Sequence, residues 1–445
     1  MSSRLALSRG RATAWCGVAL VAFVLELLFF TTWRNRLGPY WSPLLFGGAG
    51  LLLGGAALAA LRDQPLRWAS AALVARRVNW AALAWLAGTL LVLYRQVPIV
   101  LGIPIDVHSS DVIPIVQAYV SRFRSGEVVY RYLTNLPYPL FPNHLPLQWL
   151  PYVPAQVLGV DFRWLSLAML LVLGFGAYQL VLLRRPGSWL SFGVRALLPA
   201  LVLWLVIDQD FYLYAQVLET TIIAYYFLLA ASVLSGSAWA QGGALVLCLL
   251  SRYSVVFWVP FFLWVLWREA GPRHTLVVAL VVGAGLVGIY IVPFLAKDPT
   301  IFTHALSEYR LATIGEWSRV DPALGLPLHV GNGLSIIPWL YRFLPLPLDA
   351  KISWVQRLHA LASMGTGELL IGFYWRYGRR YDYRVLALIG LKLYLVVFYF
   401  FIQIPYAYLI SLSVLLSVFV VLLLLGSSHE EAGAQNANAS TPPVS

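Results

Sequence analysis

Residues 80–101 read WAALAWLAGTLLVLYRQVPIVL, and residues 105–112 read IDVHSSDV. The first stretch is mostly apolar and long enough to cross a bilayer as a helix, which takes about 20 residues. The second opens a polar interruption that runs on to residues 142–144 and holds the carboxylates Asp106 and Asp111 and the histidines His108 and His144. We therefore expect a membrane protein that carries out chemistry in a large loop at the lipid surface.

The composition supports a membrane protein. Hydrophobic residues make up 60% of the 445-residue chain and charged residues only 11%, whereas a soluble domain carries roughly 25% charged residues. The net charge of +12 does not indicate nucleic acid as a partner, because arginines in short loops serve to orient membrane helices. Cys16 and Cys248 fall inside apolar runs, so no disulfide framework is expected.

The apolar runs predict an all-α polytopic fold with about twelve transmembrane helices. Arginine-rich turns follow the second, fourth, eighth and tenth of these helices and lie on the same side as the N-terminus. The positive-inside rule makes that side cytoplasmic in an inner or plasma membrane, with both termini there. The polar tail 426–445 is expected to be disordered. The predicted spans are 13–31, 41–61, 80–101, 162–183, 193–207, 213–234, 238–250, 254–268, 274–294, 353–375, 384–402 and 405–425.

Two long segments, 104–160 and 296–352, then remain on the outer face, and long loops are more often functional than connective. In the first segment, Ser109 or Ser110 can cap a helix. The apolar stripe that begins at Val112 predicts an amphipathic helix lying on the membrane.

Asp111 is the first candidate for catalysis. It would sit at the start of that helix, where the helix dipole favours a carboxylate, and it could act as a general base. The alternative is an aspartate that only starts the helix. Asp106 is the rival base. Asp106, His108 and Asp111 could also be read as metal ligands, but their spacing matches no metal motif and we predict no metal site.

The remaining candidates would bind substrate. Arg252 could hold a phosphate or snorkel to lipid headgroups. Glu219 lies inside an apolar helix, where an acid is costly unless it faces a polar cavity. Glu26 also lies inside an apolar helix and is a weaker candidate of the same kind. His144 could carry a proton or donate to a sugar, or be a plain loop histidine. The others are Asp208 (beside Asp210), with a solvated turn as the alternative, Arg310, which could hold a phosphate as Arg252 could, and His329, with a plain loop histidine as the alternative.

Several short motifs are similar to those of a known family. They are Asp111-Val112-Ile113 with Tyr119 and Gly126-Glu127-Val128-Val129-Tyr130, then Leu136-Pro137-Tyr138-Pro139-Leu140, Ser251-Arg252-Tyr253, and Gly331-Asn332-Gly333-Leu334-Ser335. In this order they resemble the GT-C superfamily of membrane glycosyltransferases, and its polyprenyl-phosphomannose-dependent mannosyltransferase branch in particular. The family often has Tyr-Pro-Pro where this chain has Tyr138-Pro139-Leu140.

The resemblance implies an inverting glycosyltransferase that moves a sugar, with mannose expected, from a polyprenyl-phosphate donor at the extracytoplasmic face. The acceptor would be a glycolipid, a glycan or a glycoprotein. Asp111 matches the family's catalytic aspartate, Tyr138 falls in its substrate-binding stretch, and no cofactor is implied. Residues 1–79 would be a two-helix extension of a catalytic domain at 80–425. The alternatives are a transporter or lipid flippase without glycosyl transfer, and a non-catalytic scaffold.

Overall fold

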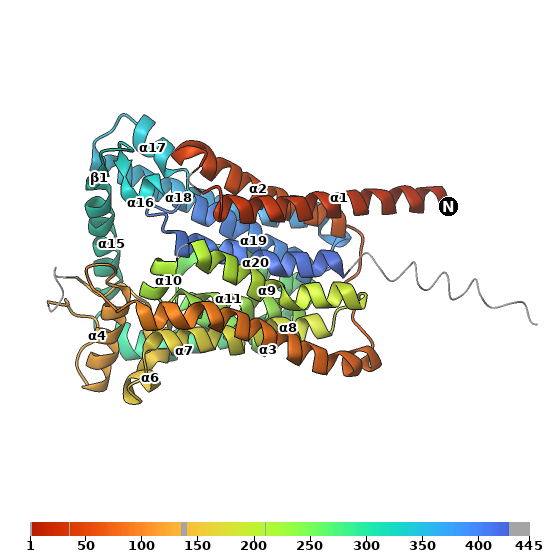
Figure 1. Ribbon diagram of the computed structural model, residues 1–445, viewed down its shortest axis with the longest axis horizontal. Coiled ribbons are helices and arrows are strands. Elements are labelled where there is room, and N and C mark those ends of the chain that lie inside the picture. Colours follow the sequence, from red (N-terminus) through yellow and green to blue (C-terminus); the bar gives the residue numbers. More distant parts are fainter. Residues whose placement is uncertain (1, 35, 135–139, 210, 427–445) are drawn as a thin grey trace, which may run out of the picture.

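The structure is a computed structural model that describes residues 2–34, 36–134, 140–209 and 211–426, and it is a bundle of helices (Figure 1). Within these ranges, eight helices are long and apolar enough to cross a membrane. The chain is thus a multi-pass helical membrane protein by the length and composition of its helices. The eight are α1 (Ser2–Phe30), α2 (Gly38–Leu61), α3 (Ala71–Gly102), the continuous α7–η2–α8 (Phe162–Leu183), α9 (Trp189–Gln209), the continuous α14–η4 (Pro272–Leu295), α19 (Tyr383–Phe400) and α20 (Ala407–Leu425).

The other four predicted spans are also helical. Three are short: α11 (Glu219–Ser235), α12 (Ala238–Leu249) and α13 (Val259–Glu269). The fourth, α18 (Leu348–Tyr377), is long but not apolar enough to count as a candidate span. The all-α fold is confirmed, while the count of twelve spans stays a prediction.

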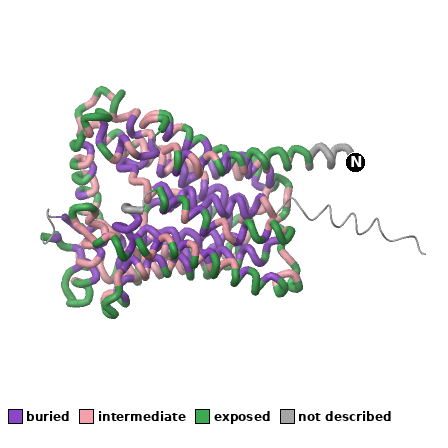
Figure 2. Tube along the Cα trace, viewed as in Figure 1, coloured by how far each residue is buried: buried purple, intermediate pink, exposed green. Residues whose placement is uncertain are grey.

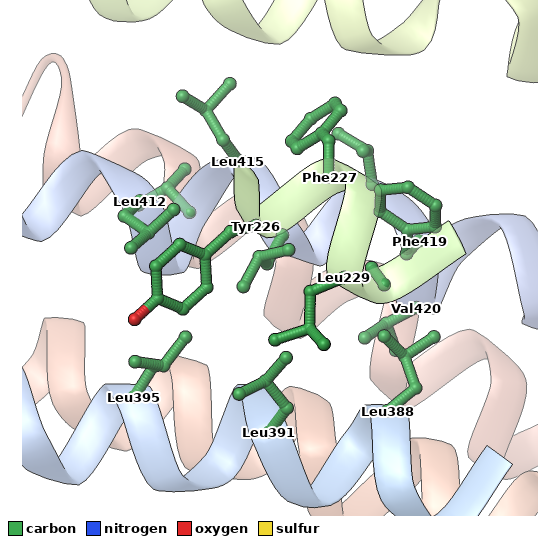
Figure 3. Packing of buried hydrophobic residues seen from close by; sticks show 14 of the residues in the cluster. Tyr226, Phe227, Leu229, Leu388, Leu391, Leu395, Leu412, Leu415, Phe419 and Val420 are labelled. Atoms are coloured by element: carbon green, nitrogen blue, oxygen red, sulfur yellow. The ribbon is translucent and has the colours of Figure 1, made fainter. Parts of the chain in front are cut away.

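The centre of the bundle is formed by α11, α19 and α20. Every residue of α20 from Ile410 to Leu424 is buried, as expected of a helix that is apolar all round and surrounded by other helices. Figure 2 shows the buried residues concentrated along the middle of the bundle. Figure 3 shows how Tyr226 and Leu229 of α11 pack between the leucines of α19 and those of α20.

The N-terminal pair α1 and α2 packs on this centre. Gly50 and Gly54 of α2 lie directly against Val396 and Leu393 of α19, and a Cβ at either glycine would collide with those side chains. Small residues at such contacts let membrane helices approach closely. The predicted domain boundary at residue 79 falls inside α3, which begins at Ala71.

A buried ion pair also joins the N-terminal pair to the centre. Glu26 of α1 accepts a hydrogen bond from the ammonium group of Lys392 on α19 and another, of 2.7 Å, from the hydroxyl of Ser417 on α20. Both charged side chains are almost fully buried. Glu26 therefore has a structural partner that sequence reasoning did not identify.

The two ends of the bundle differ in character. At the arginine end, which carries the start of α1 in Figure 1, three of the four arginine-rich turns contact one another: Asp63 donates its backbone N–H to Arg380, and Ala69 to Arg184. The short 3-10 helix η5 (Gly378–Arg380) belongs to this end. The sequence correctly placed these turns on one side.

The opposite end, which we call the loop end, gathers both long segments (Figure 1). The Tyr132 hydroxyl donates to Glu308 across them, over 3.4 Å. The first segment forms α4 (Val112–Arg124), α5 (Pro146–Trp149), η1 (Leu150–Tyr152) and α6 (Val153–Val157). The second forms α15 (Ile301–Ser318), the small antiparallel pair β1 (Val320–Asp321) and β2 (Leu326–Pro327), α16 (Leu328–Gly331) and α17 (Ile337–Phe343).

The predicted amphipathic helix is α4, but its apolar face is not laid on lipid. Ile113, Val116 and Tyr119 are fully buried in a small core that includes Trp149 and Tyr152. The reason is that α5, η1 and α6 fold back over α4 and supply the apolar surface that lipid would otherwise provide. This compact core fixes the start of α4, and with it Asp111.

Candidate functional site

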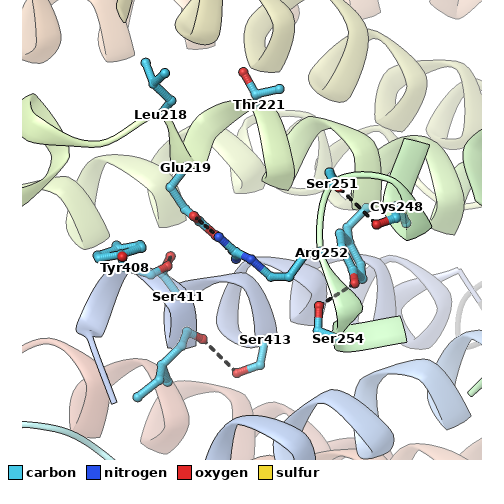
Figure 4. Close-up of polar contacts among 12 residues, drawn as sticks. Leu218, Glu219, Thr221, Cys248, Ser251, Arg252, Ser254, Tyr408, Ser411 and Ser413 are labelled. Carbon is cyan, nitrogen blue, oxygen red and sulfur yellow. Dashed lines mark hydrogen bonds and ion pairs between the residues drawn. The ribbon is translucent and has the colours of Figure 1, made fainter. Parts of the chain in front are cut away.

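The most distinctive polar contact of the loop end is an ion pair between Arg252 and Glu219. Arg252 Nη1 lies 2.5 Å from Glu219 Oε1, and Nη2 lies 2.7 Å from Oε2. Figure 4 shows the two side chains meeting head-on between α11 and α20. The exposed fraction is 2% for the Glu219 side chain and 15% for that of Arg252. Sequence reasoning chose both residues separately, and the structure brings them together.

Local breaks in the helices create this pair. Glu219 is the first residue of α11 and follows a break after α10 (Phe211–Gln216). Arg252 is extended, with φ −157° and ψ 143°, between the end of α12 and the short η3 (Tyr253–Val255). A carboxylate in the first turn of a helix is favoured by the dipole. The two-pronged contact satisfies both charges where each alone would be costly.

His144, in the first long segment, lies within electrostatic range of Arg252. It is half-buried, and its Nδ1 lies 3.2 Å from the hydroxyl of Tyr119 on α4. Its backbone carbonyl accepts a hydrogen bond of 3.0 Å from Tyr130. Burial lowers the pKa of His144 to about 4, while the charge of Asp111 raises it and that of Arg252 lowers it further. The imidazole is therefore neutral at pH 7.

Asp111 is the residue that precedes α4, and its backbone carbonyl accepts the first helical hydrogen bond, from Ile115. Its side chain is half-buried. His144 and Tyr408 each lie within electrostatic range of both Asp111 and Arg252. We call Asp111, His144, Glu219, Arg252 and Tyr408 the loop-end cluster.

Tyrosines complete the surroundings of this cluster. Tyr399 and Tyr309 lie within electrostatic range of Arg252. Tyr406, just before α20, is half-buried. Its removal from water raises its pKa well above the usual value, and the charge of Asp111 adds to the shift. Sequence reasoning missed all of these. A signal existed only for the pair Tyr406 and Tyr408, which flank the start of an apolar helix as interfacial aromatics do.

Asp106 and His108 play a more local part. The Asp106 carboxylate accepts from the His108 backbone N–H over 3.0 Å and from the Ser109 hydroxyl over 3.1 Å. These two hydrogen bonds lower the pKa of Asp106, and they form a side-chain turn typical of aspartate. His108 is exposed. In the described part of the chain, no three His, Cys, Asp or Glu residues are grouped to hold a metal ion.

Three other predicted residues find partners outside the loop-end cluster. Asp208 pairs with Arg95 at 2.7 Å, and Arg310 pairs with Asp349 at 2.6 Å. His329 lies 3.6 Å from Glu316 and packs its ring on Tyr406, which places it at the edge of the cluster. Tyr138 lies outside the described residues.

Comparison with known proteins adds no relative. No protein-family model, no curated protein and no solved structure matches this chain. A function must therefore be inferred from the residues of the chain itself, above all from those around Arg252 and Asp111.

Proposed function

We propose that the protein is an inverting glycosyltransferase that takes a sugar, with mannose expected, from a polyprenyl-phosphate donor and transfers it to a glycolipid, glycan or glycoprotein acceptor at the loop end. The observation that carries the proposal is that a carboxylate, Asp111, and a deeply set guanidinium, Arg252, act electrostatically on the same two residues, His144 and Tyr408. A transfer from a lipid phosphate needs both kinds of group at the end of an apolar bundle.

Arg252 would stabilise the departing phosphate. A guanidinium has five N–H donors. Glu219 accepts from one on each terminal nitrogen and the Tyr399 hydroxyl is within reach of a third, so two remain for phosphate oxygens. Glu219 holds the planar group in one orientation. Such pre-oriented donors stabilise charge that develops in the transition state.

Asp111 would act as the base. The acceptor oxygen forms its bond to the anomeric carbon while the bond from that carbon to the phosphate oxygen breaks. The acceptor proton goes to the Asp111 carboxylate, and the phosphate leaves with the electron pair. Attack opposite the leaving group inverts the anomeric carbon. One base suffices because phosphate needs no protonation to leave, unlike the alcohol in glycoside hydrolysis.

An apolar groove at the same end suits the carrier's hydrocarbon tail. It has a volume of about 560 Å³ and lies between α2 and α17, lined by Leu44, Ile336, Trp339, Leu340, Phe343 and Leu344. A polyprenyl chain requires such an apolar path because its transfer into water is costly.

The experiment is a transfer assay on purified protein in liposomes with polyprenyl-phosphate mannose as donor. Asp111→Asn should lower the rate by roughly 10²–10⁴-fold, the usual contribution of a general base. Glu127→Gln, an exposed acid of the same segment, should keep the wild-type rate. A folded Asp111→Asn protein with undiminished transfer would remove Asp111 from the mechanism.

A transporter is the second candidate, and the two buried ion pairs favour it. Charged pairs inside apolar helices, here Glu219–Arg252 and Glu26–Lys392, often mark ion or substrate pathways in membranes. Counterflow of a lipid-linked or free sugar in proteoliposomes, without any transferred product, would favour transport over glycosyl transfer.

A further inference from the structure

The arginine end contains a second unusual group of charges. In each of the pairs Arg76-Arg77 and Arg184-Arg185, the first arginine is exposed and the second is buried. Arg77 is 1% exposed, Arg185 3% and Arg195, on α9, 0%. Arginines that only orient a membrane helix need no burial, since their guanidinium groups can remain in water. The buried three therefore need another explanation.

The buried arginines donate hydrogen bonds to backbone carbonyls. Arg77 Nη1 donates to the carbonyl of Arg185 over 3.0 Å, Arg185 Nη1 to that of Arg67 over 2.7 Å, and Arg195 Nη2 to that of Pro186 over 3.0 Å. These bonds fasten the turn between α8 and α9 to its neighbours. They leave three positive charges close together.

The anionic groups of the described residues do not balance the charges of Arg185 and Arg195. Asp382 lies within range of Arg185, but it is held by Arg384 at 2.7 Å. The end of α20 offers only the partial negative charge of a helix C-terminus, equivalent to roughly half an electron charge. Burial, with repulsion from Arg195 and Arg384, lowers the pKa of Arg185 to about 10.

Arg185 Nε and Arg195 Nη1 are buried N–H groups that have no hydrogen-bond acceptor among the described residues. Both face Gly426 at the end of α20. A Cβ at Gly426 would stand 3.4 Å from Arg185 Nε and 3.2 Å from Arg195 Nη1. A buried donor without an acceptor is costly, so an acceptor is expected where glycine leaves the space.

We propose that Arg185 and Arg195, backed by Arg77, bind the phosphate of an anionic phospholipid. Phosphate oxygens match the planar fork of a guanidinium and bring the missing negative charge. The candidate spans end at this level, with Leu183 closing one, Trp189 opening the next and Leu425 closing the last. The site thus lies at headgroup depth. Trp68 and Trp189, 38% and 45% exposed, have the position of interfacial anchors. The site is independent of the proposed glycosyl transfer.

The test measures lipid binding by thermal unfolding of the full-length protein in vesicles. Wild-type protein should have a higher Tm in phosphatidylcholine vesicles that contain phosphatidylglycerol than in pure phosphatidylcholine, because a ligand of the folded state stabilises it. Arg185→Gln and Arg195→Gln should each bind phosphatidylglycerol about tenfold more weakly, the effect of one lost charge-assisted contact. Arg184→Gln, the exposed neighbour, should respond like the wild type.

A further variant keeps the test valid if the arginine variants do not fold. Gly426→Val leaves every arginine in place but fills the space before the two free N–H groups, so it should also reduce the lipid response. An equal response of wild type, Arg185→Gln and Gly426→Val to phosphatidylglycerol would overturn the proposal. So would a Tm rise with inorganic phosphate in pure phosphatidylcholine that equals the rise with phosphatidylglycerol, because the occupant would then be a soluble phosphate and not a lipid.

Discussion

Among single residues, Glu219 and Arg252 are the most tightly interdependent. Glu219 was expected to face a polar cavity and Arg252 to hold a phosphate, yet they share a two-pronged ion pair. In a buried pair, the mutual attraction chiefly offsets the cost of removing both charges from water. The pair therefore orients the Arg252 guanidinium more than it stabilises the fold. It fixes the direction in which the remaining N–H donors of Arg252 point.

Removing one member of this pair should be harmful. Glu219→Gln leaves the Arg252 charge buried without its carboxylate, and we expect the free energy of unfolding to fall by roughly 3–5 kcal/mol. Unfolding in detergent, followed by tryptophan fluorescence, measures the change. Asp349→Asn breaks the exposed pair with Arg310 and should cost about 1 kcal/mol or less. Equal losses in the two variants would show that the inner pair is not specially buried.

His144 makes the free energy of unfolding depend on pH, and the sign of this dependence follows from its lowered pKa. In the unfolded chain a histidine takes up its proton near pH 6.5, but folded His144 does so only near pH 4. The unfolded state therefore binds more protons between these values, and stability falls as the pH drops through them. His144→Gln should remove roughly 2 kcal/mol of the loss between pH 7 and pH 5.

Unfolding of wild type and His144→Gln at both pH values tests this expectation, with His108→Gln as the control because its ring is exposed. A wild-type pH dependence that His144→Gln leaves unchanged would mean that another group is responsible.

Among the structural elements, α4 is the most important for the proposed function because it positions Asp111. Arg122, in its last turn, donates to the carbonyls of Val129 at 3.2 Å, Arg131 at 2.5 Å and Tyr132 at 2.9 Å. One side chain thus folds the following segment back onto the helix. The sequence does not predict this contact, because a single arginine gives no hint of which distant carbonyls it will bind.

Arg122→Gln should loosen that segment. Loss of even one of its three hydrogen bonds, each from a charged donor and worth roughly 1.5 kcal/mol, should speed amide hydrogen exchange in residues 125–134 by about tenfold or more. Hydrogen exchange followed by mass spectrometry measures it. Arg124→Gln, from the exposed side of the same turn, should leave the exchange rates as they are. Equal exchange rates in both variants would contradict the view that Arg122 holds this segment against α4.

For the molecule as a whole, the pair of Glu26 and Lys392 ties the N-terminal helices to the central ones. Glu26→Gln alone should lower stability by roughly 3–5 kcal/mol, because Lys392 stays buried without its partner. The double variant Glu26→Leu with Lys392→Met should recover most of that loss, since apolar replacements of a buried pair are often tolerated. Scanning fluorimetry of the three proteins would show it, and a double variant no more stable than the single one would contradict this view.

The sequence predicted the general architecture well and the partnerships poorly. Apolar runs located the helices that cross the bundle, because the hydropathy of a segment can be read from its consecutive residues. The long segments at one end and the arginine turns at the other followed from counting those runs. The pairs Glu219–Arg252 and Glu26–Lys392 were out of reach, because their members are 33 and 366 positions apart and no short pattern links them. The burial of Arg77, Arg185 and Arg195 was missed for the same reason.

One measurement bears on the proposed transfer more than any other: a density map of the protein with a polyprenyl-phosphate sugar bound. We predict the phosphate on the guanidinium of Arg252 and the anomeric carbon with Asp111 as its nearest carboxylate. A sugar bound beside Asp208, at Asp106 away from Arg252, or at the arginine end of the bundle would contradict the proposed function.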